Sequence, residues 1–429
     1  MSIEELYKIY QQYPSVQTDT RKLKPGDIFF ALKGPNFNGN AFAKQAIDAG
    51  AVCAVIDEKE YENPGKTFLV HDALTALQQL AHHHRRQFHI PFLAITGSNG
   101  KTTTKELIHV VLSSAYNVYT TEGNLNNHIG VPITILKVQE DAKMAVIEMG
   151  ANHLHEIEGY CKIAEPTHGL ITNCGKAHLE GFGSLEGVKK GKGELFEHIR
   201  NVQGTAFVMW DYDYLRELSA GIEDIVSYGT RDADVTGSIV QSSPFLRVKI
   251  DPGIEIQTQL VGDYNLPNVL AAVAVGREMK ISMSKIKDAI EAYAPSNSRS
   301  QLVQHGTNKF ILDAYNANPS SMQLAIENFA AIQADKKVLM LGAMAEMGRQ
   351  TEAEHQRLVD LIKQYKWHAV LLVGSHFERF KNEFIYFENA DAAGAWFAQQ
   401  NFTGTYFLVK GSRSSHMEKI LAAGNIAGT

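Results

Sequence analysis

Cysteine is scarce in this chain: Cys53, Cys161 and Cys174 are the only three among 429 residues. They have no metal-like spacing, and so few cysteines in so long a chain are typical of a reducing compartment. Long apolar runs are also missing, because no stretch approaches the roughly 20 residues that span a bilayer. The N-terminal segment carries acidic residues where a signal peptide would carry basic ones. These absences predict a cytoplasmic protein without membrane insertion.

An excess of positive charge is missing as well. The net charge is −6 at pH 7, which argues against general affinity for nucleic acid. Anionic ligands would therefore have to be held by local positive groups. Hydrophobic content of 44% and charged content of 21% are those of a globular protein with a sizeable core. At about 150 residues for each domain, the length predicts three domains.

Strand and helix patterns divide the chain into three α/β segments. Before Pro91, the apolar runs 27–32 and 51–56 predict strands with a helix between them. After Pro91, strands alternate with helices, which predicts a mainly parallel sheet with helices on both faces. The last segment contains three apolar strands that each end in glycine. The predicted domains are therefore residues 1–90, 91–299 and 300–429. The stretch 82–86, HHHRR, is interpreted as the solvated end of a helix and not as a metal site.

The stretch 95–104, ITGSNGKTTT, predicts a phosphate-binding loop. An apolar strand, 92–95, leads into a turn with two glycines, and a helix-like segment follows. Glycines let backbone N–H groups converge on phosphate oxygens, the helix N-terminus adds partial positive charge, and Lys101 adds a full charge. A hydroxyl directly after the lysine can hold the magnesium of a nucleoside triphosphate. The loop is a shortened variant of the general pattern, because Ile95 occupies the position of its first glycine.

More polar residues follow or close apolar strands. Glu148 ends one strand and Asn173 follows the next, so both should meet the phosphate loop at one sheet edge. A carboxylate in the position of Glu148 is costly unless it meets a cation. His178 and Lys192 come later, fourteen positions apart. Alone, each of these two also fits a structural role, as a capping or core histidine and as a lysine on a solvated helix face.

Taken together, these patterns resemble the Mur ligase family, the ATP-dependent amide-bond-forming enzymes of peptidoglycan precursor synthesis. The resemblance extends over nearly the whole chain. The segments that carry it are residues 18–34, 121–130, 148–152, 177–183, 262–268, 313–319 and 410–413. As a set they are most similar to the family member that joins D-alanyl-D-alanine to UDP-N-acetylmuramoyl-tripeptide.

The resemblance implies an α/β fold with the three-domain Mur ligase architecture. Its first domain would hold the UDP end of the substrate. Its second would be a P-loop-type, mainly parallel sheet domain that binds ATP and Mg²⁺, and its third a Rossmann-like domain that brings the amine. ATP would phosphorylate the tripeptide carboxylate, and the amine of the dipeptide would attack the acyl phosphate. The same resemblance implies a monomer that contacts neither nucleic acid nor membrane.

The resemblance also assigns roles to residues. Lys192 matches the position at which the family carries a carbamylated lysine, and Arg299 would reach the γ-phosphate. The implied catalytic residues are Lys101, Glu148, His178, Lys192 and Arg299. Metal would be held by Thr102, Glu148, His178 and Lys192. The nucleotide would be bound by Gly97, Ser98, Asn99, Gly100, Lys101, Thr102, Thr103, Asn265, Asn268, Arg299, Asp313 and Tyr315. The peptide substrates would be bound by Asp19, Thr20, Arg21, Asn124, Asn126, Asn127, Lys410, Ser412 and Arg413.

Several alternatives stay open on the sequence. The chain could be a sister ligase that adds one amino acid, a folylpolyglutamate synthase relative, a nucleotide-driven switch or motor, or a binding protein without activity. Asn265 could cap a helix, and either His178 or a water could take the proton of the amine. The chain departs from the family pattern at Tyr264, at Asn38–Asn40 and at Ala343.

Overall fold

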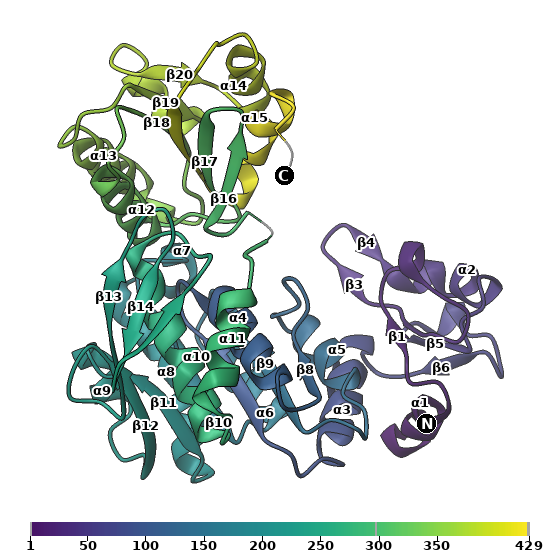
Figure 1. Cartoon of the computed structure of the whole chain (residues 1–429). Coiled ribbons are helices and arrows are strands. Elements are labelled where there is room, and N and C mark those ends of the chain that lie inside the picture. Colours follow the sequence, from purple (N-terminus) through teal and green to yellow (C-terminus); the bar gives the residue numbers. More distant parts are fainter. Residues whose placement is uncertain (1, 297, 427–429) are drawn as a thin grey trace.

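The computed structural model describes residues 2–296 and 298–426 as three α/β units (Figure 1). The N-terminal unit has a four-stranded parallel sheet in the order β1-β2-β5-β6 and a short β3–β4 hairpin. Its strands are β1 (Val16–Gln17), β2 (Ile28–Phe30), β3 (Lys33–Gly34), β4 (Phe37–Asn38), β5 (Cys53–Ile56) and β6 (Thr67–Leu69). Its helices are α1 (Ile3–Gln12), α2 (Ala43–Asp48) and α3 (Ala73–Arg85).

The central unit has a nine-stranded sheet in the order β15-β14-β13-β12-β11-β10-β7-β9-β8. Its strands are β7 (Phe92–Thr96), β8 (Val118–Thr120), β9 (Met144–Glu148), β10 (His168–Ile171), β11 (Thr205–Met209), β12 (Asp224–Gly229), β13 (Val235–Gln241), β14 (Arg247–Ile250) and β15 (Ile254–Gln257). Pairing is parallel from β8 to β13 and antiparallel for β14 and β15, so the predicted parallel sheet carries an antiparallel extension at one edge.

Helices surround the central sheet, with apolar faces turned toward it. They are α4 (Lys101–Ser113), α5 (Gly130–Leu136), α6 (Glu156–Ala164), α7 (Leu179–Phe182), α8 (Leu185–Asn201), α9 (Asp213–Leu218), α10 (Leu266–Glu278) and α11 (Met283–Ala292). The strands β7, β9 and β11 are buried along their whole length, which explains why their sequences are almost entirely apolar. The strand β7 lies inside the sheet, third from its β8 end, so the loop that follows it stands between the loops after β9 and β10.

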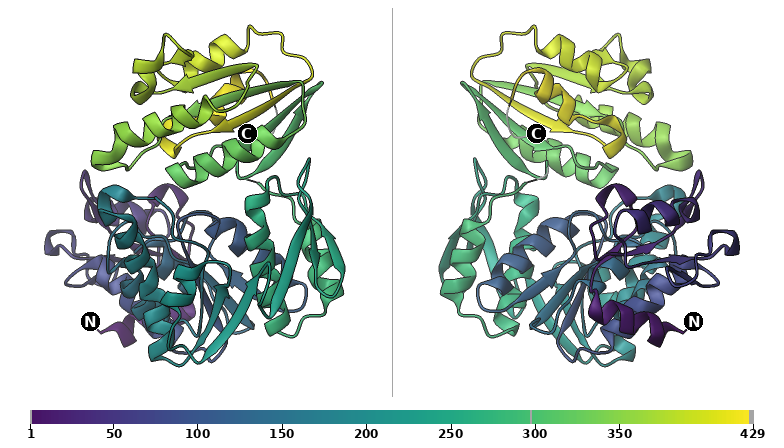
Figure 2. Two further views of the ribbon diagram at one scale, coloured as in Figure 1. Left: turned by 90° about the vertical axis from the view of Figure 1, so that its left-hand side faces the viewer. Right: turned by 90° about the vertical axis from the view of Figure 1, so that its right-hand side faces the viewer.

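The third unit has a six-stranded sheet in the order β16-β17-β21-β18-β19-β20, parallel except for the β16–β17 pair. Its strands are β16 (Gln301–His305), β17 (Asn308–Asp313), β18 (Lys336–Gly342), β19 (Ala369–Val373), β20 (Ile385–Phe387) and β21 (Thr405–Lys410). Its helices are α12 (Pro319–Ala331), α13 (Thr351–Ile362), α14 (Ala390–Phe397) and α15 (Glu418–Ala423). Figure 2 shows this unit stacked over one end of the central unit, with α12 on the facing side.

Two helices of the N-terminal unit, α1 and α3, share a core with the central unit. Leu6 of α1 and Leu77 of α3 belong to the same buried cluster as Leu93 of β7 and Ile135 of α5. The first sheet buries its other face in a separate small cluster around Phe29 and Ala54. Residue 90 therefore separates two segments of the sequence whose apolar cores are continuous. Within the described residues, none of the helices is long and apolar enough to cross a bilayer.

The basic end of α3 is not the solvated face that the sequence suggested. His84 and Arg85 are buried, and the His84 Nε2 atom lies 2.8 Å from the Val138 carbonyl oxygen. The Arg85 guanidinium donates to the carbonyl oxygens of Ala164 at 2.7 Å and of Glu165 at 2.8 Å. The prediction was wrong for these two residues because the last turn of α3 packs against α6 of the central unit, where the guanidinium satisfies the carbonyls at the helix end.

Replacing Arg85 by methionine should lower the free energy of unfolding by about 3 kcal/mol. The change removes charged hydrogen bonds to buried carbonyls, which contribute about 1.5–3 kcal/mol each, and it removes stacking on the Phe92 ring, whose centroid lies 3.9 Å from the guanidinium carbon. Urea denaturation measures the effect. The exposed neighbour Arg86 is the control, because its replacement by methionine should change stability by less than about 0.5 kcal/mol. Equal effects of the two changes would contradict this account.

Candidate active site

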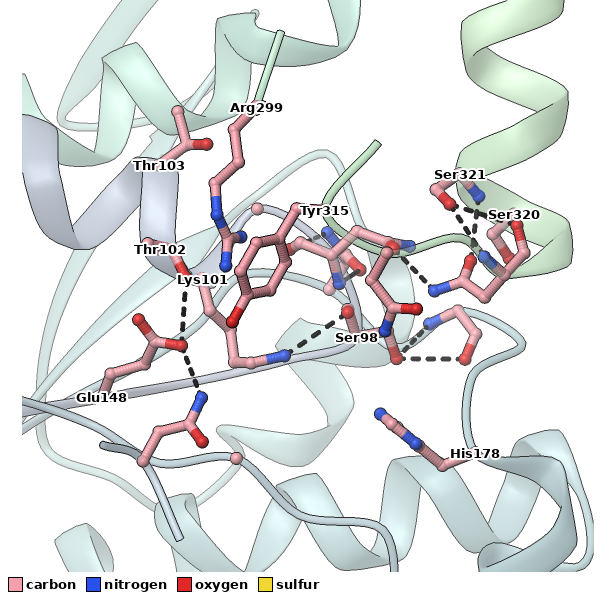
Figure 3. Close-up of a pocket in the computed structure, with 18 of the residues that line it drawn as sticks. Ser98, Lys101, Thr102, Thr103, Glu148, His178, Arg299, Tyr315, Ser320 and Ser321 are labelled. Atoms are coloured by element: carbon pink, nitrogen blue, oxygen red, sulfur yellow. Dashed lines mark hydrogen bonds between the residues drawn. The ribbon is translucent and has the colours of Figure 1, made fainter. Parts of the chain in front are cut away.

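A cavity of about 690 Å³ lies between the central and third units. The central unit lines it with the phosphate loop, with the loops that follow β8, β9, β10 and β11, and with the start of α10. The third unit lines it with the residues after β17 and with the first turn of α12. Figure 3 shows side chains of both units pointing into this space. The cavity therefore stands at the C-terminal ends of parallel strands, where open α/β sheets bind ligands.

The phosphate loop is held from the neighbouring strand β10. The Ser98 amide donates to the Asn173 carbonyl at 2.9 Å, and the Asn99 amide donates to the Asn173 side-chain oxygen at 3.0 Å. The Asn173 amide group in turn donates to the Asn99 carbonyl at 3.0 Å, and the Thr172 hydroxyl donates to it at 2.7 Å. The predicted meeting of the loop with Asn173 at one sheet edge is confirmed.

Two glycines of this loop are required by its shape. Gly97 has φ of 142°, and a Cβ atom there would stand 2.0 Å from the Thr172 hydroxyl oxygen. Gly100 has φ of 80°, and a Cβ atom there would stand 2.7 Å from the Asn268 side-chain oxygen. Both residues combine a left-handed backbone with a close neighbour, which only glycine tolerates. Gly97 therefore lets the loop pass close to Thr172. It is not among the residues that line the cavity.

Replacing Gly97 by alanine should weaken ADP binding at least about tenfold. The methyl group would push Thr172 away and misplace the backbone N–H groups of the loop, which form the anion site. Isothermal titration with ADP and Mg²⁺ checks this expectation. Gly159 is a matched control, because it lies inside α6 with open space around it, so alanine there should leave ADP binding unchanged and stabilise the helix by about 1 kcal/mol. Wild-type ADP affinity in the Gly97 variant would contradict the loop assignment.

Lys101 is the first residue of helix α4, and its side chain turns back over the phosphate loop. Its ammonium group donates to the Gly97 carbonyl at 2.6 Å and lies 3.4 Å from the Ser98 carbonyl (Figure 3). Burial lowers the pKa of Lys101, and the nearby Glu148 carboxylate opposes that shift. A cation in this position is poised for an anionic ligand and is costly without one.

Glu148 ends β9 with its carboxylate almost fully buried, at 1% exposure. One carboxylate oxygen, Oε1, accepts hydrogen bonds from the Thr102 hydroxyl at 3.1 Å and from the Asn126 amide at 2.8 Å. The other oxygen, Oε2, has no hydrogen-bond partner within the described part of the chain. A buried carboxylate oxygen without a partner, beside a threonine hydroxyl, is the donor set that Mg²⁺ prefers. The residues present therefore fit a magnesium ion.

Lys192 lies on α8, and its side chain is buried at 1% exposure. Its amine donates to the Ala151 carbonyl at 2.8 Å and lies 5.2 Å from the centre of the Phe182 ring. Burial is the main reason that the pKa of Lys192 is lowered to about 7, and Lys101 lowers it further. Unlike Ala151, Lys192 does not itself line the cavity. The structure thus gives this lysine an environment in which the neutral amine is well populated near pH 7.

Asn265 and Asn268 border the cavity together at the start of α10. The Asn268 amide donates to the Asn265 side-chain oxygen at 2.8 Å, and the Asn265 amide donates to the Val261 carbonyl at 2.9 Å. Asn265 precedes α10 but makes no side-chain capping hydrogen bond, so the alternative capping role is wrong. Across the cavity, the Arg299 guanidinium carbon lies 3.6 Å from the centre of the Tyr315 ring. In Figure 3, Arg299 and Tyr315 lie side by side above Lys101.

Some predicted site residues do not reach the cavity. Asp19 and Arg21 form an exposed ion pair at 2.8 Å in the N-terminal unit, next to Thr20. In the third unit, the Ser412 hydroxyl donates to the Ala343 carbonyl at 2.6 Å, and Arg413 lies on the surface. Lys410 does line the cavity, but its buried amine pairs with Asp313 at 2.5 Å. The loop asparagines Asn124, Asn126 and Asn127 all line the cavity.

Several residues that the sequence did not single out also border the cavity. Asn318 caps α12 and donates to the Asn99 side-chain oxygen at 2.8 Å, and the Ser320 hydroxyl accepts from the Lys176 amide at 2.9 Å. The stacked rings of Tyr212 and Tyr214 follow β11. The Asn-Pro pair at residues 318–319 signals a helix start, and the position after an apolar strand signals a sheet edge, so both sets were accessible from the sequence.

Among the described residues, no three histidine, cysteine, aspartate or glutamate side chains gather as a ready metal site. Thr102, Glu148 and His178 share the cavity, and Lys192 lies behind it. A metal held in this cavity would therefore depend on the Thr102 hydroxyl as well as on Glu148 and His178. The phosphate loop at the edge of a parallel sheet, faced by a second α/β unit, defines a nucleotide-binding α/β protein.

Three family models match successive parts of the chain. The "Mur ligase family, catalytic domain" model matches residues 12–85, the "Mur ligase middle domain" model matches residues 95–276, and the "Mur ligase, glutamate ligase domain" model matches residues 298–413. The chain belongs to the Mur ligase family.

Individual relatives are similar over almost their full length. A UDP-N-acetylmuramoyl-tripeptide–D-alanyl-D-alanine ligase from Bacillus subtilis is 34% identical, with 95% of this chain and 92% of the relative covered. The ligase of the same name from Escherichia coli is 34% identical, with 97% and 94% covered. A crystal structure of MurF from Acinetobacter baumannii has a TM-score of 0.86 at 29% identity and covers 97% of each chain. MurF from Thermotoga maritima in complex with ADP has a TM-score of 0.86 at 25% identity, with 96% of each chain covered.

Proposed function

We propose that this protein is an ATP-dependent ligase that joins D-alanyl-D-alanine to UDP-N-acetylmuramoyl-tripeptide, which completes the peptide of the peptidoglycan precursor. The observation that best supports this proposal is the cavity between the central and third units. It combines a phosphate loop with a buried carboxylate oxygen that has no partner among the described residues. The named relatives, similar across all three units, support the choice of substrates.

The proposed reaction proceeds through an acyl phosphate. A carboxylate resists attack by an amine because it is negatively charged and has a poor leaving group. Transfer of the terminal phosphoryl group of ATP to the tripeptide carboxylate supplies a good leaving group. The amine of the dipeptide then attacks the carbonyl carbon, and phosphate leaves. The protein contributes by holding several anionic groups close together in one orientation.

The roles of the residues follow from their positions. Lys101 and the loop amides would hold the terminal phosphates, and Arg299 would approach them from the side of the third unit. Thr102, Glu148, His178 and a carbamylated Lys192 would hold magnesium, which neutralises phosphate charge when bound. Asn265 and Asn268 present amides that suit the edge of adenine. Asp313, whose carboxylate is fixed by Lys410, would bind the ribose hydroxyls.

Other parts of the proposal concern the N-terminal unit and the whole chain. We take residues 1–90, 91–299 and 300–429 as the three functional domains. Residues 19–21 would contact the uridine nucleotide. The UDP end of the substrate would extend from the cavity to these residues of the N-terminal unit. The loop asparagines 124, 126 and 127 would contact the sugar-peptide, and Lys410, Ser412 and Arg413 would act on the side of the dipeptide. We place the protein in the cytoplasm as a monomer, which light scattering on the purified chain tests.

ADP formation is the decisive assay. Purified protein receives ATP, Mg²⁺ and UDP-N-acetylmuramoyl-tripeptide, with D-alanyl-D-alanine in one reaction and single amino acids in others. A further reaction contains ATP and Mg²⁺ without any peptide. ADP and the pentapeptide product should form only with the dipeptide. ADP formed with a single amino acid would instead identify a sister ligase, and ADP formed without any peptide would identify a nucleotide switch. Absence of ADP in every reaction would refute the proposal.

A further inference from the structure

The third unit contacts the central unit at a histidine of the candidate metal set. The Nδ1 atom of His178 forms an ion pair with the Glu346 carboxylate, which belongs to the loop after β18. The Glu180 amide also donates to the Glu346 backbone carbonyl at 3.2 Å. His178 lies at the cavity in Figure 3, apart from the phosphate loop and below the start of α12. Two loops from different units therefore meet at the edge of the cavity through a side-chain contact and a backbone contact.

Both partners of this ion pair have an unusual backbone. His178 has φ of 51° and Glu346 has φ of 60°, in the left-handed region that residues with side chains seldom adopt. Such a conformation costs about 1 kcal/mol or more for each residue. The Glu346 side chain is half exposed, so the ion pair itself contributes at most about 1 kcal/mol to stability. The free energy gained from this ion pair therefore does not offset the cost of two left-handed backbones. Backbone strain of this type is concentrated at functional sites.

The loop that carries Glu346 is anchored from its own unit. The Met344 amide donates to the Nε2 atom of the fully buried His355 at 3.1 Å, and the His355 Nδ1 atom donates to the Thr351 carbonyl at 2.6 Å. Gly348 approaches the central unit so closely that a Cβ atom there would stand 3.3 Å from the Glu180 Cα atom. The Glu346 carboxylate therefore contacts His178 from a loop that is held in place by its own unit. This contact depends on the present arrangement of the central and third units.

We propose that Glu346 is a positioning residue for His178, so that the third unit completes the metal-holding set of the central unit. This inference rests on the proposed function. With a metal bound, the carboxylate would accept the Nδ1 proton, which selects the tautomer with a lone pair on Nε2; among the described residues, Nδ1 has no other partner. In the described part of the chain, no hydrogen bond or ion pair engages that Nε2 atom. A carboxylate behind a metal-binding histidine fixes the ring and makes it a better ligand. The structure adds that the carboxylate comes from another domain, so metal binding and domain closure are coupled.

The second interdomain ion pair, Lys176 with Glu354 at 2.9 Å, touches neither His178 nor Glu148 and can hold the units together without acting on the metal set.

Binding of Mn²⁺ in the presence of ADP tests the inference without relying on turnover. Electron paramagnetic resonance counts free and bound Mn²⁺ for the wild type, Glu346→Ala, Glu346→Gln, His178→Ala and the double variant His178→Ala with Glu346→Ala. The Glu346→Ala variant should bind Mn²⁺ about tenfold less tightly or worse, as is usual for the loss of a residue behind a metal ligand. Glutamine keeps an acceptor and should recover part of that loss. In the His178→Ala background, removal of Glu346 should cause no further loss.

Controls separate this inference from other causes. Glu352→Gln, on the exposed side of α13, should bind Mn²⁺ as the wild type does. Wild-type Mn²⁺ affinity in a folded Glu346→Ala variant overturns the proposal. An equal loss in the His178→Ala background also overturns it, because the effect would then be general loosening of the domain contact. Failure of the proposed function would instead appear in the wild type itself, as absence of ADP-dependent Mn²⁺ binding and of ligation.

Discussion

Replacing Lys101 by methionine should reduce ATP-dependent ligation by at least about 100-fold, because removal of one preorganised charge from such a site raises the barrier by about 3 kcal/mol. Methionine has a similar length but no charge, so the shape of the loop is kept. The ammonium group is held 2.6 Å from the Gly97 carbonyl, which places it at the mouth of the phosphate loop. There it would neutralise charge on the phosphoryl group in transit.

The fold should survive this change. Burial already lowers the pKa of Lys101, so the charged amine is a cost to the free protein, and the nearby Glu148 carboxylate keeps its hydrogen bonds from Thr102 and Asn126 when that amine is removed. ADP release under saturating substrates measures kcat, and a thermal melt checks folding. Lys285→Met, at an exposed position of α11, should keep wild-type kcat. A folded Lys101 variant with normal turnover would show that the loop does not act on phosphate.

The main strands could be predicted because they are buried on both faces. The runs around Phe92–Thr96, Met144–Glu148 and Thr205–Met209 are apolar except for one polar residue at an end of each, and the structure contains strands β7, β9 and β11 there. The strands β1 and β20 were missed because they have two or three half-buried residues, too few for a pattern. The antiparallel extension from β13 to β15 was also missed, since its exposed positions interrupt the apolar signal.

The local part of the site could also be predicted, whereas its interdomain part could not. The glycines and the lysine of the phosphate loop are neighbours in sequence, and the strand-end rule brought Asn173 to them. The contact of Asn99 with Asn318 joins residues 219 positions apart, and it depends on how the third unit docks. The same holds for His178 with Glu346, because no spacing in the sequence relates two loops on different sheets. The burial of Arg85 was missed for this reason too.

The second large effect on ligation is expected when Lys192 is replaced. Replacing it by methionine should lower ligation by at least about 100-fold, because the carbamate that holds magnesium in the proposed mechanism can no longer form. Lys190→Met is a matched control, since it changes an exposed lysine two positions away on α8 and should keep full activity. Mass spectrometry under conditions that preserve labile adducts should find CO2 added to Lys192 and not to Lys190. Normal ligation by a folded Lys192→Met variant would refute its role.

The chemistry of carbamylation also predicts a dependence on pH. Only the neutral amine attacks CO2, and burial lowers the pKa of Lys192 from 10.5 to about 7, so about half of the unmodified side chains are neutral at pH 7. Since the folded protein binds this proton less tightly than the unfolded chain, stability of the CO2-free protein should rise from about pH 7 toward pH 10.5. Urea denaturation at pH 7 and pH 9 should therefore show a gain that is smaller in Lys192→Met. An equal gain in both proteins would mean that Lys192 is charged when folded, and a charged lysine could not become the metal ligand proposed here.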